Sequence, residues 1–145
     1  MTDDQKLKTL QMYYAAALAD STLRYGRAGI LDDVAAQKRA EQMAAGTALA
    51  GRFGVKKPQD AFLATADTYG CADWTCENTN GGFIATAGHC TLCAMAKHMG
   101  DYSPCKIHCL SPMEAMLKGV APEAKFVVEE TLWDSDECKV NVRIT

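Results

Sequence analysis

Several features that mark other classes of protein are missing from this sequence. It has no block of lysine or arginine, and its 15 Lys+Arg against 18 Asp+Glu leave a net charge of −3. Nucleic-acid-binding proteins usually carry a basic patch or stripe, so nucleic acid is not expected to be the main partner. The apolar runs are too short and too interrupted to cross a bilayer, so no membrane partner is expected either.

A signal peptide and an even set of cysteines are also missing. The first five residues are acidic and lack the basic-then-apolar layout of a secretory signal. This predicts a cytoplasmic location, where thiols stay reduced, and the odd count of seven cysteines agrees with it. Reduced cysteines in such a protein are usually buried core residues, metal ligands or reactive nucleophiles.

The length and composition predict a single domain over residues 1–145. A chain of 145 residues has the size of one domain, and a 48% apolar content is enough for one hydrophobic core. No cysteine occurs before residue 71. Residues 1–70 are expected to form a helical layer, and residues 71–145 a cysteine-rich α+β core.

Three helices are predicted in the first half of the chain. Apolar residues at helical spacing predict a helix over residues 4–25. Asp32 or Asp33 can cap a second helix that runs to about residue 53. A third, shorter helix is expected from Pro58 to about residue 68, because proline suits the first helical turn.

Two β-hairpins are predicted in the second half. The first joins residues 71–78 to residues 83–87 through Asn80-Gly81, a pair that favours a type I′ turn with positive φ at both positions. The second joins residues 125–133 to residues 138–144. The predicted fold class is therefore α+β: an N-terminal helical layer, a β-hairpin, short helices and a second hairpin, with the strands in one antiparallel sheet.

Short helices between the hairpins carry a cluster of four cysteines. Cys90 and Cys93 lie at the start of a helix expected to end near Met99, and Cys105 and Cys109 lie on a second helical turn. A third helix is expected over residues 113–118, behind a capping box of Ser111 and Glu114. His108 lies three residues after Cys105, so the sequence places it on the same helical face as Cys105 and Cys109.

This cluster has three interpretations. As a metal site, Cys90, Cys93, Cys105 and Cys109 would supply four thiolates for zinc or an iron–sulfur cluster. As a reactive site, Cys90 or Cys109 would be the nucleophile, since a helix N-terminus favours a thiolate at Cys90, and His108 would move protons. As plain packing, the cysteines would fill a core. Packing is favoured for the cysteines at 71, 76 and 138, while at 90 and 109 it is as well supported as function.

Glu130 has two possible placements. In an unbroken strand it shares a face with Phe126, Val128 and Leu132, where burial would raise its pKa and allow general acid–base catalysis. A bulge at Glu129-Glu130 would turn it to solvent instead, and an edge-strand glutamate at the surface is the commoner case.

The second half of the chain resembles a known family. The segment from Phe83 to Cys90, the later Cys105 and Cys109, and residues 125–142 with Asp136 and Cys138 are similar to the 2-amino-thiazoline-4-carboxylate hydrolase-like family of small bacterial proteins. The layout more distantly resembles the 4-vinyl reductase type of small-molecule-binding domain. The resemblance implies an α+β fold and hydrolytic opening of a cyclic C–N bond, with Cys90, Cys109 and Cys138 as the positions carried over.

Two functions follow as hypotheses. The first is a hydrolase that opens a cyclic amidine with a Cys/His site built from Cys90, Cys109, His108 and Glu130. The second is a non-enzymatic sensor or carrier that binds a metal, an iron–sulfur cluster or a small ligand. In both, the expected partner is a small molecule, and the Ala-rich helical layer could supply a homodimer face.

Overall fold

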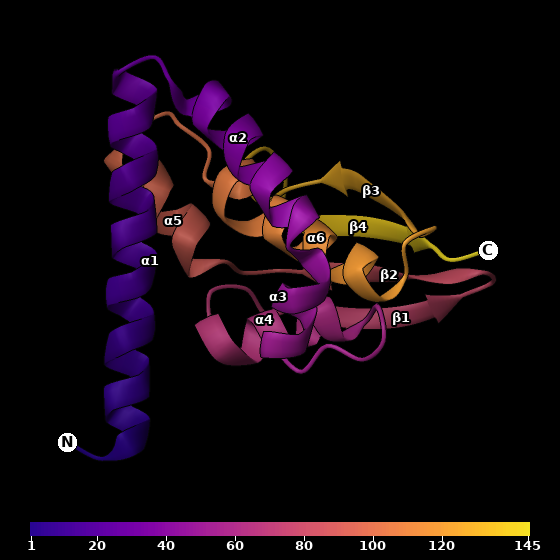
Figure 1. Cartoon of the computed structure of the whole chain (residues 1–145). Helices are drawn as coiled ribbons and strands as arrows, with labels where there is room; N and C mark the ends of the chain where they lie inside the picture. The colour runs from indigo at the N-terminus through magenta and orange to yellow at the C-terminus, as the bar shows by residue number, and fades with distance from the viewer.

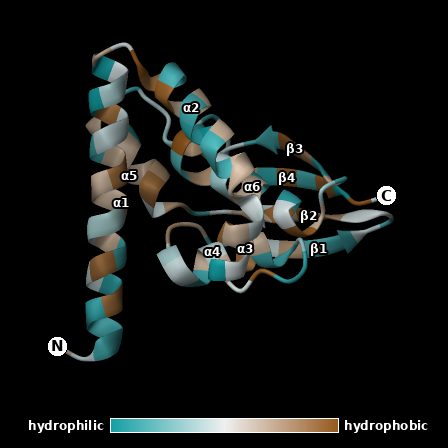
Figure 2. Ribbon diagram, viewed as in Figure 1, coloured by the Kyte–Doolittle hydropathy of each residue, from teal (hydrophilic) through white to brown (hydrophobic).

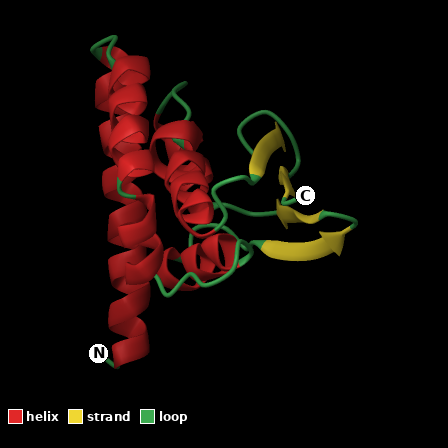
Figure 3. Ribbon diagram, turned by 45° about the vertical axis from the view of Figure 1, so that its right-hand side comes forward, coloured by secondary structure: helices red, strands yellow, loops and turns green.

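Helices form one side of the molecule and a four-stranded sheet forms the other (Figure 1, Figure 3) in the computed structural model, which describes residues 1–145. All four strands pair antiparallel in the order β1-β2-β4-β3, so the α+β prediction is confirmed. The elements are α1 (Asp3–Arg27), α2 (Leu31–Ala44), α3 (Gly46–Arg52), α4 (Asp60–Tyr69), β1 (Thr75–Thr79), β2 (Gly82–Ala87), α5 (Thr91–Met99), the π-helical turn η1 (Cys105–Leu110), α6 (Ser111–Val120), β3 (Lys125–Glu130) and β4 (Cys138–Arg143).

The long helix α1 stands along the helical side of the molecule. Its start is fixed by a capping box between Thr2 and Gln5. Buried Ala15 and Ala19 allow α5 to pack closely, and Ala19 forms a small apolar cluster with Leu92 of α5. Although α1 has 25 residues, no helix combines the length and the apolar character of a membrane span.

Ala15 and Ala19 are thus buried by contacts within the chain, whereas Ala16 and Ala17 are exposed. Large apolar side chains nevertheless remain exposed in its first turns, which extend past α4 (Figure 1, Figure 2), with Leu10 67% and Tyr13 72% exposed. The homodimer stays a prediction.

The single second helix predicted up to residue 53 is wrong, because the chain breaks at Ala45 into α2 and α3. The break turns α3 onto α6, and the two helices approach so closely that a Cβ on Gly46 would collide with the Ala115 carbonyl. The predicted caps are also wrong. Ile30 is the N-cap, and Asp32 and Asp33 lie in the first turn of α2, where the helix dipole favours acidic residues.

Both predicted hairpins form, with differences at their ends. The first strand begins at Thr75, later than predicted, because the Asp73 carboxylate accepts hydrogen bonds from the Gly88 and His89 amides and holds a loop. In the turn only Gly81 has a positive φ, at 86°. Asn80 does not, so the predicted type I′ turn is wrong, and the signs of φ are those of a type II turn.

The helical turn predicted around Cys105 is a π-helical turn that continues directly into α6. The Ser111 amide donates to the carbonyl of Lys106, five residues back, and the backbone of Ser111 is itself helical. Ser111 therefore cannot be the N-cap, and the predicted capping box with Glu114 is wrong.

The main core lies between the sheet and the helices α3, α4 and α6. Phe62 of α4 is fully buried at its centre, with ring centroids 5.1 Å from Trp74 and 5.8 Å from both Phe83 and Phe126. On β4 the predicted alternation is confirmed: Val140 and Val142 are fully buried.

Candidate functional site

Five cysteine side chains line one small cavity beside this core. Cys90 is the N-cap of α5 and Cys93 lies in its first turn, Cys105 and Cys109 come from η1, and Cys138 begins β4. The cavity measures about 10 Å³, which is room for roughly one water molecule. All seven cysteines of the chain are free thiols.

The arrangement does not fit the predicted zinc ion or iron–sulfur cluster. No group of three or more His, Cys, Asp or Glu side chains is placed so that it could hold a metal ion. The four cysteines predicted as ligands therefore gather in space without forming a metal centre.

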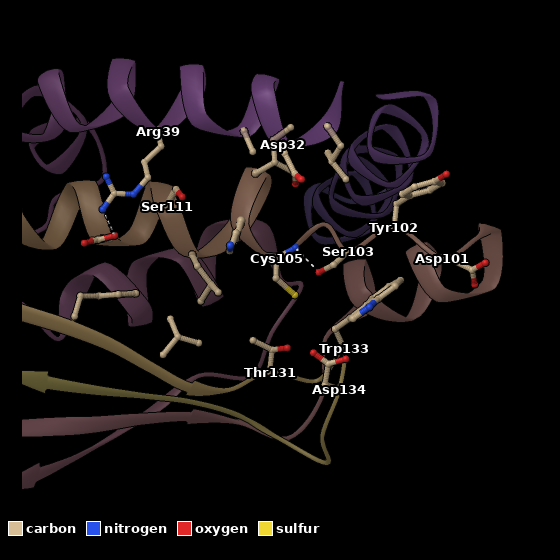
Figure 4. A pocket seen from close by; sticks show the side chains of 18 residues that line it. Asp32, Arg39, Asp101, Tyr102, Ser103, Cys105, Ser111, Thr131, Trp133 and Asp134 are labelled. Atoms are coloured by element: carbon tan, nitrogen blue, oxygen red, sulfur yellow. Dashed lines mark hydrogen bonds and ion pairs between the residues drawn. The ribbon is translucent and has the colours of Figure 1, made fainter. Parts of the chain in front are cut away.

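A larger open cleft of about 620 Å³ lies next to the thiol cavity (Figure 4). Its walls come from α2, from residues 101–111, from Phe126 and Val128 of β3, and from residues 131–134. Cys105 is the one cysteine that lines both spaces. Its sulfur is therefore reachable from the cleft and continuous with the buried thiols behind it.

Polar side chains lie around the Cys105 sulfur. The neighbouring side chains of Cys93, Ser103 and Thr131, in that order of influence, lower the pKa of Cys105 to about 7, whereas burial acts in the opposite direction. The neighbouring Cys105 side chain and the burial of Cys93 together raise the pKa of Cys93. The backbone amide of Cys105 donates to the Ser103 hydroxyl oxygen at 3.2 Å, which leaves the hydroxyl proton free to point at the sulfur. Of the two thiols, Cys105 is therefore the one that loses its proton more readily.

The cleft contains charges of both signs. Glu114 is ion-paired with Arg39 at 2.9 Å and with Lys118 at 2.7 Å. No ion pair involves Asp32, Asp101, Asp134 or Lys106 among the remaining charged residues of the lining. Three free carboxylates against one ammonium favour a ligand that carries a positive group.

Aromatic side chains complete the walls. Tyr102, Phe126 and Trp133 line the cleft, and Lys97 lies 5.8 Å from the centre of the Trp133 ring. Tyr102 packs directly against Gly26 of α1, where any Cβ would collide with its ring. This contact anchors the segment that carries Ser103 and Cys105.

The structure places the predicted nucleophiles Cys90 and Cys109 behind Cys105. Neither lines the open cleft, although both are partly exposed and line other, smaller cavities. A nucleophile at Cys90 or Cys109 stays a prediction, and the thiol that lines the open cleft and has a lowered pKa is Cys105.

His108 lines a second small cavity together with Cys90 and Cys109, as the sequence led us to expect, but it does not line the cavity that holds Cys105. A π-helical turn is wider than an α-helical one, so the residue three positions after Cys105 turns away from it, whereas Cys109, four positions after it, stays on its side. The His108 ring points toward the N-terminal helices: Nε2 lies 2.9 Å from Ser21 Oγ and Nδ1 lies 3.4 Å from Lys38 Nζ. Because both ring nitrogens are engaged there and no hydrogen bond links the ring to a thiol, His108 is not the base for Cys105.

Glu130 is also separate from the thiols. The pairing of β3 with β4 shifts between Val128 and Glu130, which puts Glu130 opposite Lys139 on the outer face. Of its two possible placements, the bulged one is observed, so a catalytic Glu130 in an apolar environment is wrong. The neighbouring Glu137 side chain raises the pKa of Glu130 at this partly exposed position.

The sequence interpretation missed Ser103, Thr131 and Asp134 as neighbours of the reactive thiol. The sequence did contain a signal for Ser103. A serine two residues before Cys105 can accept a hydrogen bond from the backbone of the turn that follows it. Thr131 and Asp134 come from the segment after the β3 bulge, whose position depends on the paired sheet. Comparisons with protein families, with curated proteins and with solved structures found no match to this chain.

The lowered pKa predicts how Cys105 reacts with an alkylating agent. The rate of modification by iodoacetamide should rise with pH through about 7, whereas an ordinary cysteine responds at a pKa of about 8.5. The tryptic peptide of residues 98–106 contains Cys105 as its single cysteine, so its labelling can be followed by mass spectrometry. A midpoint at pH 8.5 or above would contradict the lowered pKa of Cys105.

The buried imidazole predicts a loss of stability in mild acid. Burial, and secondarily the charge of Lys38, lower the pKa of His108 from 6.5 to about 4. Between these values the unfolded chain binds a proton that the folded chain does not, so the free energy of unfolding should fall as the pH drops through this window. Asp60 and Asp73 also have a lowered pKa, but protonation of their carboxylates lowers the free energy of unfolding mainly below their ordinary pKa of 3.8, which lies outside this window.

Urea unfolding from pH 7 to pH 4 tests this effect. His108→Gln should flatten the pH dependence in that window, and His98→Gln, at an exposed position, should leave it unchanged. Equal slopes in all three proteins would show that His108 is not the group responsible.

Proposed function

We propose that this protein is a small-molecule hydrolase that uses Cys105 as a nucleophile to open the ring of a cyclic amidine. The observation that carries the proposal is the position of Cys105 at the boundary between the open cleft and the thiol cluster, with the polar side chains of Ser103 and Thr131 beside it. A thiolate is a strong nucleophile, and a lowered pKa is one of the ways in which proteins activate it. The resemblance to the aminothiazoline carboxylate hydrolase-like family suggests the substrate.

The cleft is suited to a small zwitterion of this kind. Its volume of about 620 Å³ lies within the usual range of ligand pockets, roughly 300–1,000 Å³. An amidinium would be attracted to Asp134, whose charge also acts on Cys105, and a carboxylate to Lys106. The flat ring would lie against Trp133 or Tyr102.

The reaction can be written without a co-reactant other than water. The Cys105 thiolate adds to the amidine carbon, and the ring C–N bond breaks with its electron pair on the ring nitrogen, which receives a proton relayed by Asp134. The amidine carbon stays bound to sulfur. A water molecule then adds to that carbon, loses a proton to Asp134, and the sulfur leaves as thiolate. The sum is one water added per ring opened.

The experiment is a turnover assay with 2-aminothiazoline-4-carboxylate. The purified, reduced protein should convert it into an open-chain product that is heavier by one water and carries a new primary amine. Mass spectrometry and an amine-reactive dye measure the two changes. A substrate that neither binds nor reacts would remove the assignment.

A second candidate is a non-enzymatic carrier of a small ligand. It is favoured by the aromatic walls of the cleft, since Tyr102, Phe126 and Trp133 suit binding of a flat molecule as well as catalysis. Calorimetric titration distinguishes the two functions: binding of the aminothiazoline carboxylate without turnover would favour the carrier.

A further inference from the structure

The contact between Cys93 and Cys105 has a chemical consequence that does not depend on the proposed hydrolase. Both side chains line the small thiol cavity, whose volume of about 10 Å³ keeps them close together, and each shifts the pKa of the other. Cys93 is buried, with 4% of its surface exposed, whereas Cys105 also lines the open cleft. One sulfur of the pair therefore meets solutes and the other lies directly behind it.

The remaining thiols of the cavity are less well placed. Cys90 is the N-cap of α5, and its sulfur accepts a hydrogen bond from the Cys93 amide at 3.4 Å. The Cys138 sulfur is engaged by the Leu132 amide at 3.2 Å. Cys93 lines the same cavity, is buried behind Cys105 and is the neighbour with the largest influence on it, so it is the first available partner for a modified Cys105.

We propose that Cys105 is a site of reversible oxidation by hydroperoxides, and that Cys93 resolves the oxidised sulfur as a disulfide. The Cys105 thiolate attacks the terminal oxygen of the hydroperoxide, the O–O bond breaks, and Cys105 becomes a sulfenic acid while hydroxide or alkoxide leaves. Cys93 then attacks the Cys105 sulfur, the S–O bond breaks, and water leaves with the Cys93 proton. The two sulfurs together lose two electrons, and these electrons reduce the peroxide.

The disulfide would alter the cleft as well as the thiols. It would join the first turn of α5 to the start of η1 and close a loop over residues 93–105. This loop contains Asp101, Tyr102 and Ser103, which line the cleft. Oxidation would thus remove the nucleophile and tie down one wall of the binding site, and a thiol reductant would reverse both.

Peptide mapping tests the proposal on the purified full-length protein. The reduced protein is treated with stoichiometric hydrogen peroxide, quenched with an alkylating agent and digested with trypsin. The expected product is a crosslink between the peptide of residues 98–106, which contains Cys105 alone, and the peptide of residues 57–97, with fragmentation placing the second sulfur at Cys93. Dithiothreitol should release both peptides in alkylatable form.

Two variants separate Cys93 from its neighbour. Cys93→Ser should give no crosslink and should trap Cys105 as a sulfenic acid that a cyclic 1,3-diketone labels. Cys90→Ser, which changes another thiol of the same cavity and keeps a good N-cap residue, should form the crosslink as the native protein does. Circular dichroism checks folding, and Cys93→Ala replaces the serine variant if that one is unfolded.

Peptide mapping of the native protein shows which cysteine pairs with Cys105, even if one of the variants does not fold. A crosslink from Cys105 to Cys90 or Cys109, an unoxidised Cys105 beside other oxidised cysteines, or a crosslink that persists in Cys93→Ser would each overturn the proposal. Because every readout is a thiol mass, the result does not depend on turnover of any substrate.

Discussion

Replacement of Cys105 by serine is expected to reduce turnover of the ring-opening substrate by about 1,000-fold or more, because the variant has no thiolate to form the covalent intermediate. Serine has nearly the same size and keeps a polar group toward Ser103 and Thr131, whose side chains lower the pKa of the native thiol. A hydroxyl stays protonated at neutral pH, however, and is a much weaker nucleophile. Steady-state kinetics with the aminothiazoline carboxylate measure the effect.

The matched control is Cys76→Ser. Cys76 is also a half-buried free thiol, but it lies on β1 and lines neither the cleft nor the thiol cavity. Its replacement should leave turnover and substrate affinity unchanged. Equal activity of the native protein and Cys105→Ser would exclude Cys105 as the nucleophile, and a parallel loss in Cys76→Ser would indicate a general effect on folding.

The location of the site could be predicted more closely than its chemistry. The spacing of Cys90, Cys93, Cys105 and Cys109 indicated a common region, and all four line one cavity. The role of each sulfur depends on exposure and on hydrogen-bond donors. Those quantities are set by the packing of η1 against α2 and by the loop after β3, which no local pattern encodes.

His108 shows why the local pattern misled the assignment. Positions three and four residues after Cys105 both lie near it in an α-helix, but the π-helical turn moves His108 away and leaves Cys109 on the same side. The extra residue in that turn lets Ile107 and Leu110 be buried while α6 begins without a break. Tertiary packing therefore determines that this turn is π-helical, and the turn in turn determines the direction of the His108 imidazole.

The fold followed from periodicity wherever the pattern was long or strict. The alternation of residues 138–143 defined β4, and the helical spacing of α1 defined its extent within two residues at each end. The break at Ala45 could not be predicted from the local sequence. It allows Gly46 to contact α6, which is about 70 residues away in the chain. The bulge at Glu129 likewise depends on register against β4.

Phe62→Ala is expected to destabilise the protein by about 3–5 kcal/mol, because the truncation leaves a cavity that the surrounding groups fill only in part. Phe62 is completely buried and contacts three aromatic rings that come from different parts of the sheet side: Trp74 before β1, Phe83 on β2 and Phe126 on β3. Its loss removes the contact through which α4 holds these elements together. Urea unfolding, followed by tryptophan fluorescence and circular dichroism, measures the change.

Leu63→Ala is the matched control, since it shortens the next side chain on the same helix at a position that is 42% exposed. That change should cost about 0.5 kcal/mol or less, as surface substitutions usually do. Similar losses for the two variants would mean that α4 is held mainly by its surface contacts. A large difference confined to Phe62 would instead identify the aromatic cluster as the link between helices and sheet. Since Phe126 belongs to this cluster and also lines the cleft, the same variant should weaken ligand binding even in conditions where it remains folded.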